Sequence, residues 1–540
     1  MTLYPDTPTV GNWPEPLEST WQLPGGDKAS DLAPKLPHLG LSDILFLSTV
    51  LSIPRPERPW GIVTWLSEVF AVSCPGLYAR VKRVRARLQP ETRSMRPGGR
   101  AASVEVTPRR LARTVLTATC PGKMAIRPLQ QLLDESFGQR RSVGWISELI
   151  SAAGRQAGQV LARQDTGALR QVIVARDETF FQNRPLLLVV EPVSATILLA
   201  QACPDRQADT WGAALLLVQE QGATIGGVVE DMARMYPKSQ QEAGFELPVQ
   251  KDLWHIQRDG GRVRRALERE AFRATERVLK PEKQLLREWD DRLFPDEYIP
   301  ADAAERHLYE QHDRFAHWLN HLVDALEPVD WRSGEIRERA INEWLLTETL
   351  TALERIEHPR VQKRVKTLRR HQSRLLTSPD WLAASLADLQ PQLARQLPHP
   401  ARQQAFCRTV ARHWRLAQAL TNGHTRFRPL ARQARADLQN WLTDQPHLQP
   451  LTDRLQALPD AAGRTSSMIE NINGLLQPFL HQHRAFRNLE TLQLYLNLFT
   501  LWHNMRRFER GKRQGKSPWQ IAGIDPGTDD WLALPGYPAG

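Results

Sequence analysis

A block of short apolar runs constrains the fold of this chain more than any other feature. Near residue 169 the pattern changes from helical to strand-like, because runs of four or five apolar residues alternate with turn residues. A helix at 209–221, ended by Gly222 as a C-cap, interrupts these runs. The block predicts a mixed sheet whose strands lie at 172–175, 186–190, 196–200, 225–229 and 245–250.

This order of elements is that of a ribonuclease H-like α/β fold, in which the first and fourth strands lie side by side. Asp177 follows the first predicted strand, and Asp231 follows the fourth. We therefore expect the two carboxylates to lie close together at the carboxyl end of the central strand pair. Each aspartate by itself could equally be an ordinary turn residue at a strand end.

A third acid is predicted near the C-terminus, where residues 464–479 begin a helix. Ser467 and Glu470 have the Ser-x-x-Glu spacing of a capping box, so Glu470 could be only a helix cap. It could also complete a metal site with the two aspartates. Phosphoryl transfer at two metal ions needs three or four carboxylates, and oxygen ligands suit Mg²⁺ or Mn²⁺. The helix has an apolar face formed by Ile469, Ile472, Leu475 and Leu476.

The length of 540 residues predicts several domains. Proline and glycine breaks and changes of period suggest where they divide. We predict a disordered or extended arm at 1–40, a helix-turn-helix domain with its linker at 41–105, a second helical DNA-binding domain at 106–166, the first part of the sheet domain at 167–258, an all-helical insertion at 259–462, and the last part of the sheet domain at 463–540.

Two helical segments before the sheet have features of DNA-binding domains. Residues 60–72 and 77–88 predict two helices separated by a break at 73–76, and the second helix is basic. A basic surface helix in a helical hairpin is the alternative. Residues 126–162 repeat the layout, with Ser142 as a predicted cap. The predicted DNA contacts of the basic helix are Arg80, Lys82, Arg83, Arg85 and Arg87.

The net charge of +11 favours polyanionic partners, with nucleic acid first. The sequence favours a cytoplasmic, nucleoid-associated protein without a membrane segment. Its four cysteines are scattered, its N-terminus has no basic segment followed by an apolar run, and it contains no 18-residue apolar run.

His481 and His483 have no further ligands at metal spacing and are expected at the surface. In the basic C-terminal tail we expect DNA-backbone contacts from Arg506, Arg507 and Lys512.

From about residue 40 onward, the sequence resembles the DDE transposases of prokaryotic insertion sequences. The similar segments are 176–181, 226–231 and 465–476, together with the signature Asp-x-x-His at 252–255. The resemblance implies that Asp177 bridges two Mg²⁺ or Mn²⁺ ions, while Asp231 and Glu470 each hold one. His255 would contact the scissile phosphate or support the site, although it could equally be a packed residue at a capped helix start.

The resemblance also implies an activity on double-stranded DNA. Such an enzyme binds the terminal inverted repeats of an element, cleaves phosphodiester bonds there, and joins the 3′-OH to target DNA, usually as a dimer or larger assembly. Two alternatives stay open. The chain could be a catalytically retired transposase derivative that only binds DNA, or a ribonuclease H-like nuclease that cuts without joining.

Overall fold

The computed structural model describes residues 106–288, 298–483 and 485–539 and a smaller part of the N-terminal region, namely 47, 50, 51, 53, 57–59, 61–70 and 72–88. The side chains of 83–88, 281 and 284–288 are not described. The chain divides into two units, 1–105 and 106–540. The predicted arm at 1–40 and linker at 89–105 lie outside the described residues.

The N-terminal unit contains the two predicted helices, α3 (Ile62–Val69) and α4 (Cys74–Leu88). They pack around a small apolar core that includes Trp65, Leu66 and Leu77. Among the described residues, no single helix is long and apolar enough to span a membrane, and only α3 with the start of α4, bent by 87°, reaches that composition as a pair.

The predicted DNA contacts in α4 are only partly described. Arg80 is half-buried and Lys82 is exposed. The side chains of Arg83, Arg85 and Arg87 lie outside the described set. DNA binding by this helix therefore stays a prediction.

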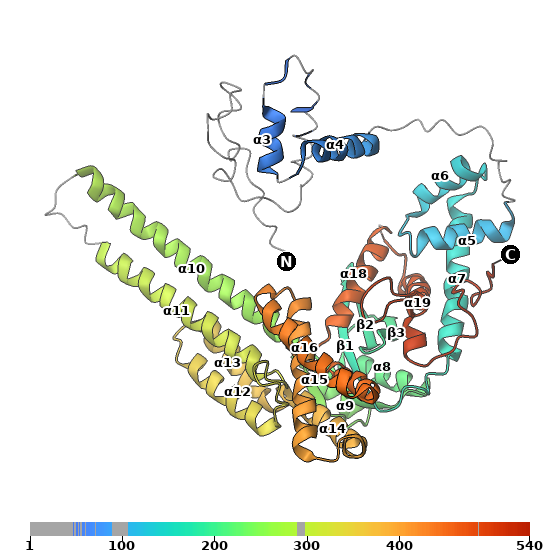
Figure 1. The fold of residues 1–540 in the computed structure, drawn as a ribbon. Helices are drawn as coiled ribbons and strands as arrows, with labels where there is room; N and C mark the ends of the chain where they lie inside the picture. Colours follow the sequence, from blue (N-terminus) through green and yellow to red (C-terminus); the bar gives the residue numbers. More distant parts are fainter. Residues whose placement is uncertain are drawn as a thin grey trace. The chain divides into compact units, whose positions relative to one another are not determined.

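The second unit is built on one mixed five-stranded sheet with the order β3-β2-β1-β4-β5 (Figure 1). Strand β1 is antiparallel to β2 and parallel to β4, so the predicted adjacency of the first and fourth strands is confirmed. The strands are β1 (Val172–Phe181), β2 (Arg184–Glu191), β3 (Thr196–Ala202), β4 (Ile225–Glu230) and β5 (Val249–Lys251). Strand β1 runs past its predicted end and contains Asp177.

Helices from both ends of this unit pack against the sheet and share its core. The N-terminal ones are α5 (Pro108–Thr119), α6 (Ile126–Phe137) and α7 (Val143–Arg163), and Ser142 caps α7 as predicted, accepting the Trp145 N–H at 3.0 Å. Helices α8 (Ala208–Glu220) and α9 (Met235–Glu242) connect strands. DNA binding by α5–α7 stays a prediction.

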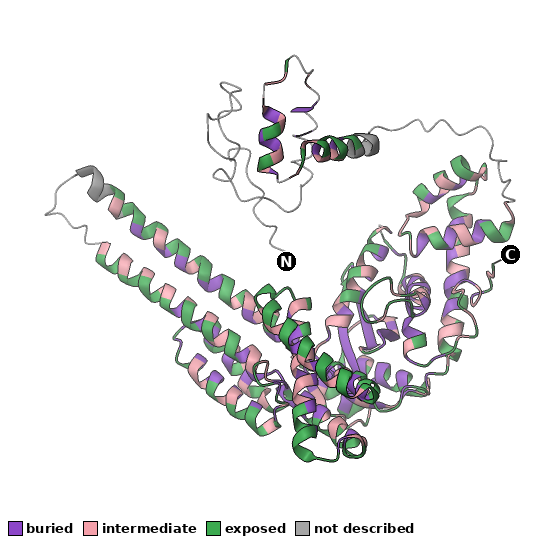
Figure 2. Ribbon diagram, viewed as in Figure 1, coloured by how far each residue is buried: buried purple, intermediate pink, exposed green. Residues whose placement is uncertain are grey.

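Between β5 and the C-terminal helices the described chain is almost wholly helical. Figure 1 shows α10 and α11 side by side, extending away from the sheet. In Figure 2 the strands are buried, whereas much of this helical hairpin is exposed. The helices are α10 (Leu253–Glu288), α11 (Tyr298–Ala325), α12 (Arg339–Glu354), α13 (Pro359–Arg370), α14 (Thr377–Gln396), α15 (Pro400–Thr421), α16 (Arg428–Asp444) and α17 (Gln449–Ala461).

Three final helices return to the sheet: α18 (Ser467–His481), α19 (Leu489–Met505) and α20 (Pro518–Ile521). Helix α18 packs on β1 and β2, and α19 packs on β3 and α7. The predicted surface position of His483 is wrong. Its ring is buried and lies 4.6 Å from that of Tyr495, because α19 folds back over the end of α18.

Candidate active site

Strand register aligns two rows of charged residues across β1, β4 and β5, just beyond the point where the parallel pairing of β1 with β4 ends. Ala175 pairs with Val229, so Asp177 and Asp231 each lie two residues beyond that pair, on neighbouring strands. Because side chains alternate between the faces of a sheet, the residues just before these aspartates project to the opposite face. One face therefore carries the acid row of Asp177 and Asp231, and the other face carries the preceding residues.

Asp177 is the most buried acid of this row, with 7% of the residue exposed. Burial raises the pKa of its carboxyl to about 7; the charge of His255 opposes this shift, and the charges of Asp231, Glu178 and Glu470 add to it. One of its oxygens accepts the Glu178 N–H at 2.9 Å. A group of carboxylates that disfavour one another's ionisation is an environment that a bound cation would stabilise.

Glu470 reaches the site from the first turn of α18, and the capping box predicted for it is not formed. The N-cap residue is Ser466, and Ser467 is already helical. The Ser466 hydroxyl donates to Asp252 at 2.5 Å, and the Ser467 hydroxyl contacts that of Thr465 at 2.8 Å. Both hydroxyls are thus engaged outside the helix terminus. The carboxylate of Glu470 is not used as a cap.

Glu470 pairs instead with a cation from another helix. Its Oε1 lies 3.6 Å from Arg258 Nη1, and both side chains are about one-third exposed. The Arg258 guanidinium also stacks over Trp254, at 4.5 Å from the ring centroid. A guanidinium therefore occupies the position of a counter-ion beside this carboxylate, at the open edge of the site.

His255 is oriented by the acid that begins its own helix. Its Nδ1 contacts Asp252 Oδ2, and Asp252 Oδ1 accepts the backbone N–H groups of Trp254 at 2.8 Å and Ser466 at 3.2 Å. Burial lowers the pKa of His255, but the hydrogen bond and charge of Asp252 and the charge of Asp177 outweigh it and raise that pKa. Asp252 thus connects the start of α10 to the start of α18 and leaves Nε2 of the imidazole for a contact in the site.

Three of the predicted site residues converge closely enough to hold one ion. Asp177, His255 and Glu470 each offer a ligand atom, and these atoms lie within 4.8 Å of one another. Two carboxylates suit Mg²⁺ or Mn²⁺, and an imidazole ligand favours Mn²⁺ of the two. A carboxylate behind the histidine, here Asp252, is the usual partner of a metal-binding imidazole. The residues therefore fit a divalent cation.

Asp231 is the predicted ligand that does not join this group of three. Its Oδ1 accepts the Ala233 N–H at 2.7 Å, in the turn after β4. It is close enough for its charge to raise the pKa of Asp177.

The other face carries a buried ion triad that the sequence analysis missed, formed by Arg176, Glu230 and Lys251. All three side chains are fully buried. Glu230 accepts from Arg176 Nε at 2.9 Å and from Lys251 Nζ at 2.7 Å. Lys251 also donates to the Asp231 carbonyl at 2.8 Å. A signal was present in the sequence, because a charged residue precedes an aspartate at 176–177, 230–231 and 251–252.

The predicted DNA contacts of the C-terminal tail are engaged within the chain. Arg507 pairs with Asp529 at 2.9 Å, and Lys512 pairs with Asp460 at 2.7 Å. Arg506 is half-buried and lies over the ring of Trp502, at 5.3 Å from its centroid. Their predicted contacts to DNA stay predictions.

Comparisons with known proteins add little to this geometry. No protein-family model and no curated protein match the chain. Among solved structures, it is similar to a Drosophila P element transposase strand transfer complex, with 11% sequence identity and a TM-score of 0.29. The alignment covers 78% of this chain and 97% of that one. A TM-score this low establishes no common fold.

Proposed function

We propose that this chain is a DDE-type DNA transposase, a metal-dependent polynucleotidyl transferase with a ribonuclease H-like catalytic domain. The observation that carries the proposal is the convergence of Asp177, His255 and Glu470 from β1, α10 and α18. Asp177 on β1 and Glu470 on α18 are 293 residues apart in the chain, yet their carboxylates reach the same point. The strand order β3-β2-β1-β4-β5 supports the ribonuclease H-like assignment.

The chemistry of the site supports phosphoryl transfer. Two divalent ions bound there would activate the attacking oxygen and stabilise the leaving oxygen of a phosphodiester. Asp177 would share both ions, with Glu470 and Asp231 each holding one of them. His255, held by Asp252, would direct Nε2 toward one ion or toward the scissile phosphate. Arg258 would leave Glu470 for a DNA phosphate when an ion arrives.

Features outside the site support DNA as the substrate. The net charge is +11, and α3 and α4 meet at 87°, close to the angle of a helix-turn-helix. Binding of terminal repeats through α4, and assembly as a dimer on two DNA ends, are parts of the proposal.

The direct test uses the full chain with DNA that carries the sequences flanking its coding region. We expect Mg²⁺- or Mn²⁺-dependent cleavage at the element ends, followed by joining to a target plasmid. Asp177→Asn and Glu470→Gln should each abolish both products. The matched control is Glu490→Gln, which changes an exposed glutamate in the first turn of α19.

The outcomes distinguish the alternatives. DNA binding without any cleavage would identify a retired transposase derivative. Cleavage without a joined product would identify a nuclease. Wild-type cleavage by both site variants would overturn the assignment of the site.

A further inference from the structure

Helix α10 carries a line of cations that begins at the candidate active site. At about 100° of rotation per residue, the directions of six other cationic side chains fall within about 60° of that of Arg258. These seven residues are called the cationic stripe. They are Arg258, Arg262, Arg265, Arg269, Arg273, Lys280 and Lys283, and all except Arg258 are exposed.

Packing fixes which way the stripe faces. The opposite side of α10 contributes Ile256, Leu267 and further buried residues to a core shared with α11. At Gly260 the two helices approach so closely that an added Cβ would lie 2.5 Å from a methyl carbon of Leu319. The helix therefore cannot turn about its axis without losing this contact, and the stripe stays directed outward.

Glu276 is exposed on the same face of α10, between Arg273 and Lys280, but ion pairs neutralise little of the remaining charge. Within the described residues, Arg265, Arg269, Arg273 and Lys280 form no ion pair, whereas Arg262 pairs with Asp259 at 3.2 Å. The acids of α11 have partners of their own, for example in the pairs Asp302–Arg306 and Glu310–Arg314.

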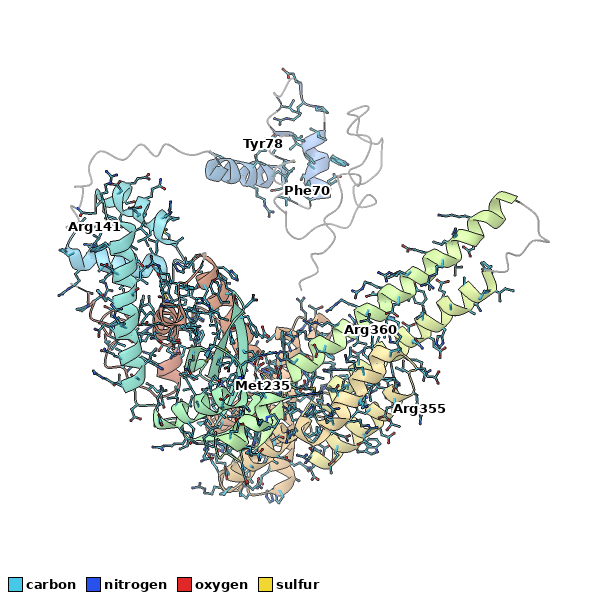
Figure 3. The ribbon with its side chains drawn as sticks, turned by 180° about the vertical axis from the view of Figure 1, so that it is seen from behind. Phe70, Tyr78, Arg141, Met235, Arg355 and Arg360 are labelled. Carbon is cyan, nitrogen blue, oxygen red and sulfur yellow. The ribbon has the colours of Figure 1, made fainter. Side chains whose placement is uncertain are left out.

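The acids of α10 that pack against the next helices are also occupied, since Asp259 pairs with Arg364 at 3.3 Å. Glu270 contacts His358 at 3.0 Å and Arg360 at 3.4 Å, and Arg360 is labelled in Figure 3 near the base of the hairpin. The two helices of the hairpin also differ in charge composition. Helix α10 has ten Lys and Arg against six Asp and Glu, while α11 has two against five. The hairpin is therefore basic along α10 only.

We propose that the cationic stripe binds the backbone of double-stranded DNA as the duplex leaves the active site. The stripe starts at Arg258, which contacts Glu470, and runs for about 38 Å at 1.5 Å per residue. That length matches about 11 base pairs of B-form DNA. A stripe of cations along one straight helix (Figure 1), continuous with the candidate active site, fits a duplex whose scissile phosphate lies in that site. This inference depends on the proposed function for the identity of the polyanion.

The test replaces the four unpaired cations, with Arg265→Gln, Arg269→Gln, Arg273→Gln and Lys280→Gln combined in the full chain. Glutamine keeps helix propensity, so α10 should stay folded, as circular dichroism would verify. The control removes equal charge from exposed positions of α14 and α16, with Arg395→Gln, Arg428→Gln, Arg432→Gln and Arg435→Gln combined. Binding to a 40-base-pair duplex is measured in EDTA, across a series of salt concentrations.

We expect the stripe variant to bind the duplex at least tenfold more weakly at 0.1 M salt, with the slope of log affinity against log salt reduced by about 3. The control variant should change both quantities much less. Equal losses in the two variants would overturn the stripe and leave only a general charge effect, as would wild-type binding by the stripe variant. A stripe variant that loses binding to anionic vesicles but not to DNA would assign the surface to a membrane and contradict the proposal.

The same experiment separates this inference from the proposed function. If the wild type cleaves and joins DNA but the stripe variant binds as tightly, the inference fails and the function stands. If the wild type binds the duplex through the stripe but never cleaves, the inference stands and the catalytic proposal fails.

Discussion

The Lys251 ammonium lies 2.7 Å from a carboxylate oxygen of Glu230, and neither side chain reaches solvent. Arg176 pairs with the same carboxylate from β1, so one buried anion serves two buried cations. Burial lowers the pKa of Lys251, and the charge and hydrogen bond of Glu230 oppose that shift. The ammonium also holds the Asp231 carbonyl at 2.8 Å. The buried triad therefore links β1, β4 and β5 on the face of the sheet opposite to Asp177 and Asp231.

Glu230→Gln is expected to destabilise the unit by about 3–5 kcal/mol, because it leaves two buried cations without their shared anion. Urea-induced unfolding measures the loss. Lys238→Met is the control, since Lys238 forms an exposed pair with Glu242 at 3.2 Å that contributes at most about 1 kcal/mol. Similar unfolding midpoints for the two variants would contradict the role of the triad.

Asp252→Asn is expected to weaken Mn²⁺ binding by about 10- to 100-fold, because the His255 ring and the start of α18 lose the carboxylate that orients them. Calorimetric titration with Mn²⁺ measures the affinity. Asp209→Asn, an exposed aspartate in the first turn of α8, should leave it unchanged. Unaltered affinity in Asp252→Asn would contradict the role of the Asp252 carboxylate in orienting His255 for metal binding.

Gly154→Ala is expected to destabilise the packing of α7 against α19 by about 1–3 kcal/mol. An added Cβ would lie 2.4 Å from the Leu494 carbonyl oxygen, and both groups belong to packed helices. Gly474→Ala provides the contrast within α18, because nothing lies within 4 Å of its added Cβ. There alanine should stabilise the helix by about 0.5–1 kcal/mol. Thermal unfolding of both variants decides whether the two shifts have opposite signs.

Acid should destabilise the folded chain through His503. Burial, reinforced by the charge of Arg506 and opposed by a hydrogen bond to Ala195, lowers its pKa to about 3. In the unfolded chain the value is about 6.5, so the unfolded state binds an extra proton between these pH values. As the pH falls through this window, the uptake of that one proton should lower the free energy of unfolding by about 1.4 kcal/mol per pH unit.

The variant His503→Gln should remove that share of the pH dependence, as measured by urea unfolding at pH 4.5, 5.5 and 7. His447→Gln, at an exposed position, is the control variant. A His503→Gln variant whose pH dependence equals that of the wild type would contradict the assignment. His483, with a pKa lowered to about 4 by burial, should add a second proton to the wild-type dependence.

The sequence was sufficient for the order of the strands and for the adjacency of β1 and β4, but not for the bounds of β1 and β5, which were predicted at 172–175 and 245–250. Apolar runs mark strands locally, and the order of elements predicts that β1 and β4 are neighbours. The position of Glu470 in the site could be expected only through the resemblance, because 239 residues separate it from Asp231. Its local signal, the capping box, was misleading. The Ser466 hydroxyl bonds to Asp252, which is distant in sequence, and the Ser467 hydroxyl contacts Thr465, which precedes the helix.

The burial of charges was harder to predict than their presence. Arg176, Glu230 and Lys251 read as polar residues at strand ends, and only the lateral register of three strands brings them together. His483 was misplaced for a related reason, since its apolar surroundings come partly from α19. In both cases the environment of a side chain depends on elements that are distant in the sequence.

The alternation of the two charged rows also protects the sheet against misalignment. A slip of one residue between β1 and β4 would exchange the faces of every side chain on the slipped strand. Asp177 would then enter the interior, and Arg176 would leave Glu230 and Lys251 behind as an incomplete cluster. Such a state would carry uncompensated buried charge costing about 3–5 kcal/mol. The triad would thus penalise misaligned strand pairings, because only the native register brings Arg176 and Lys251 to Glu230.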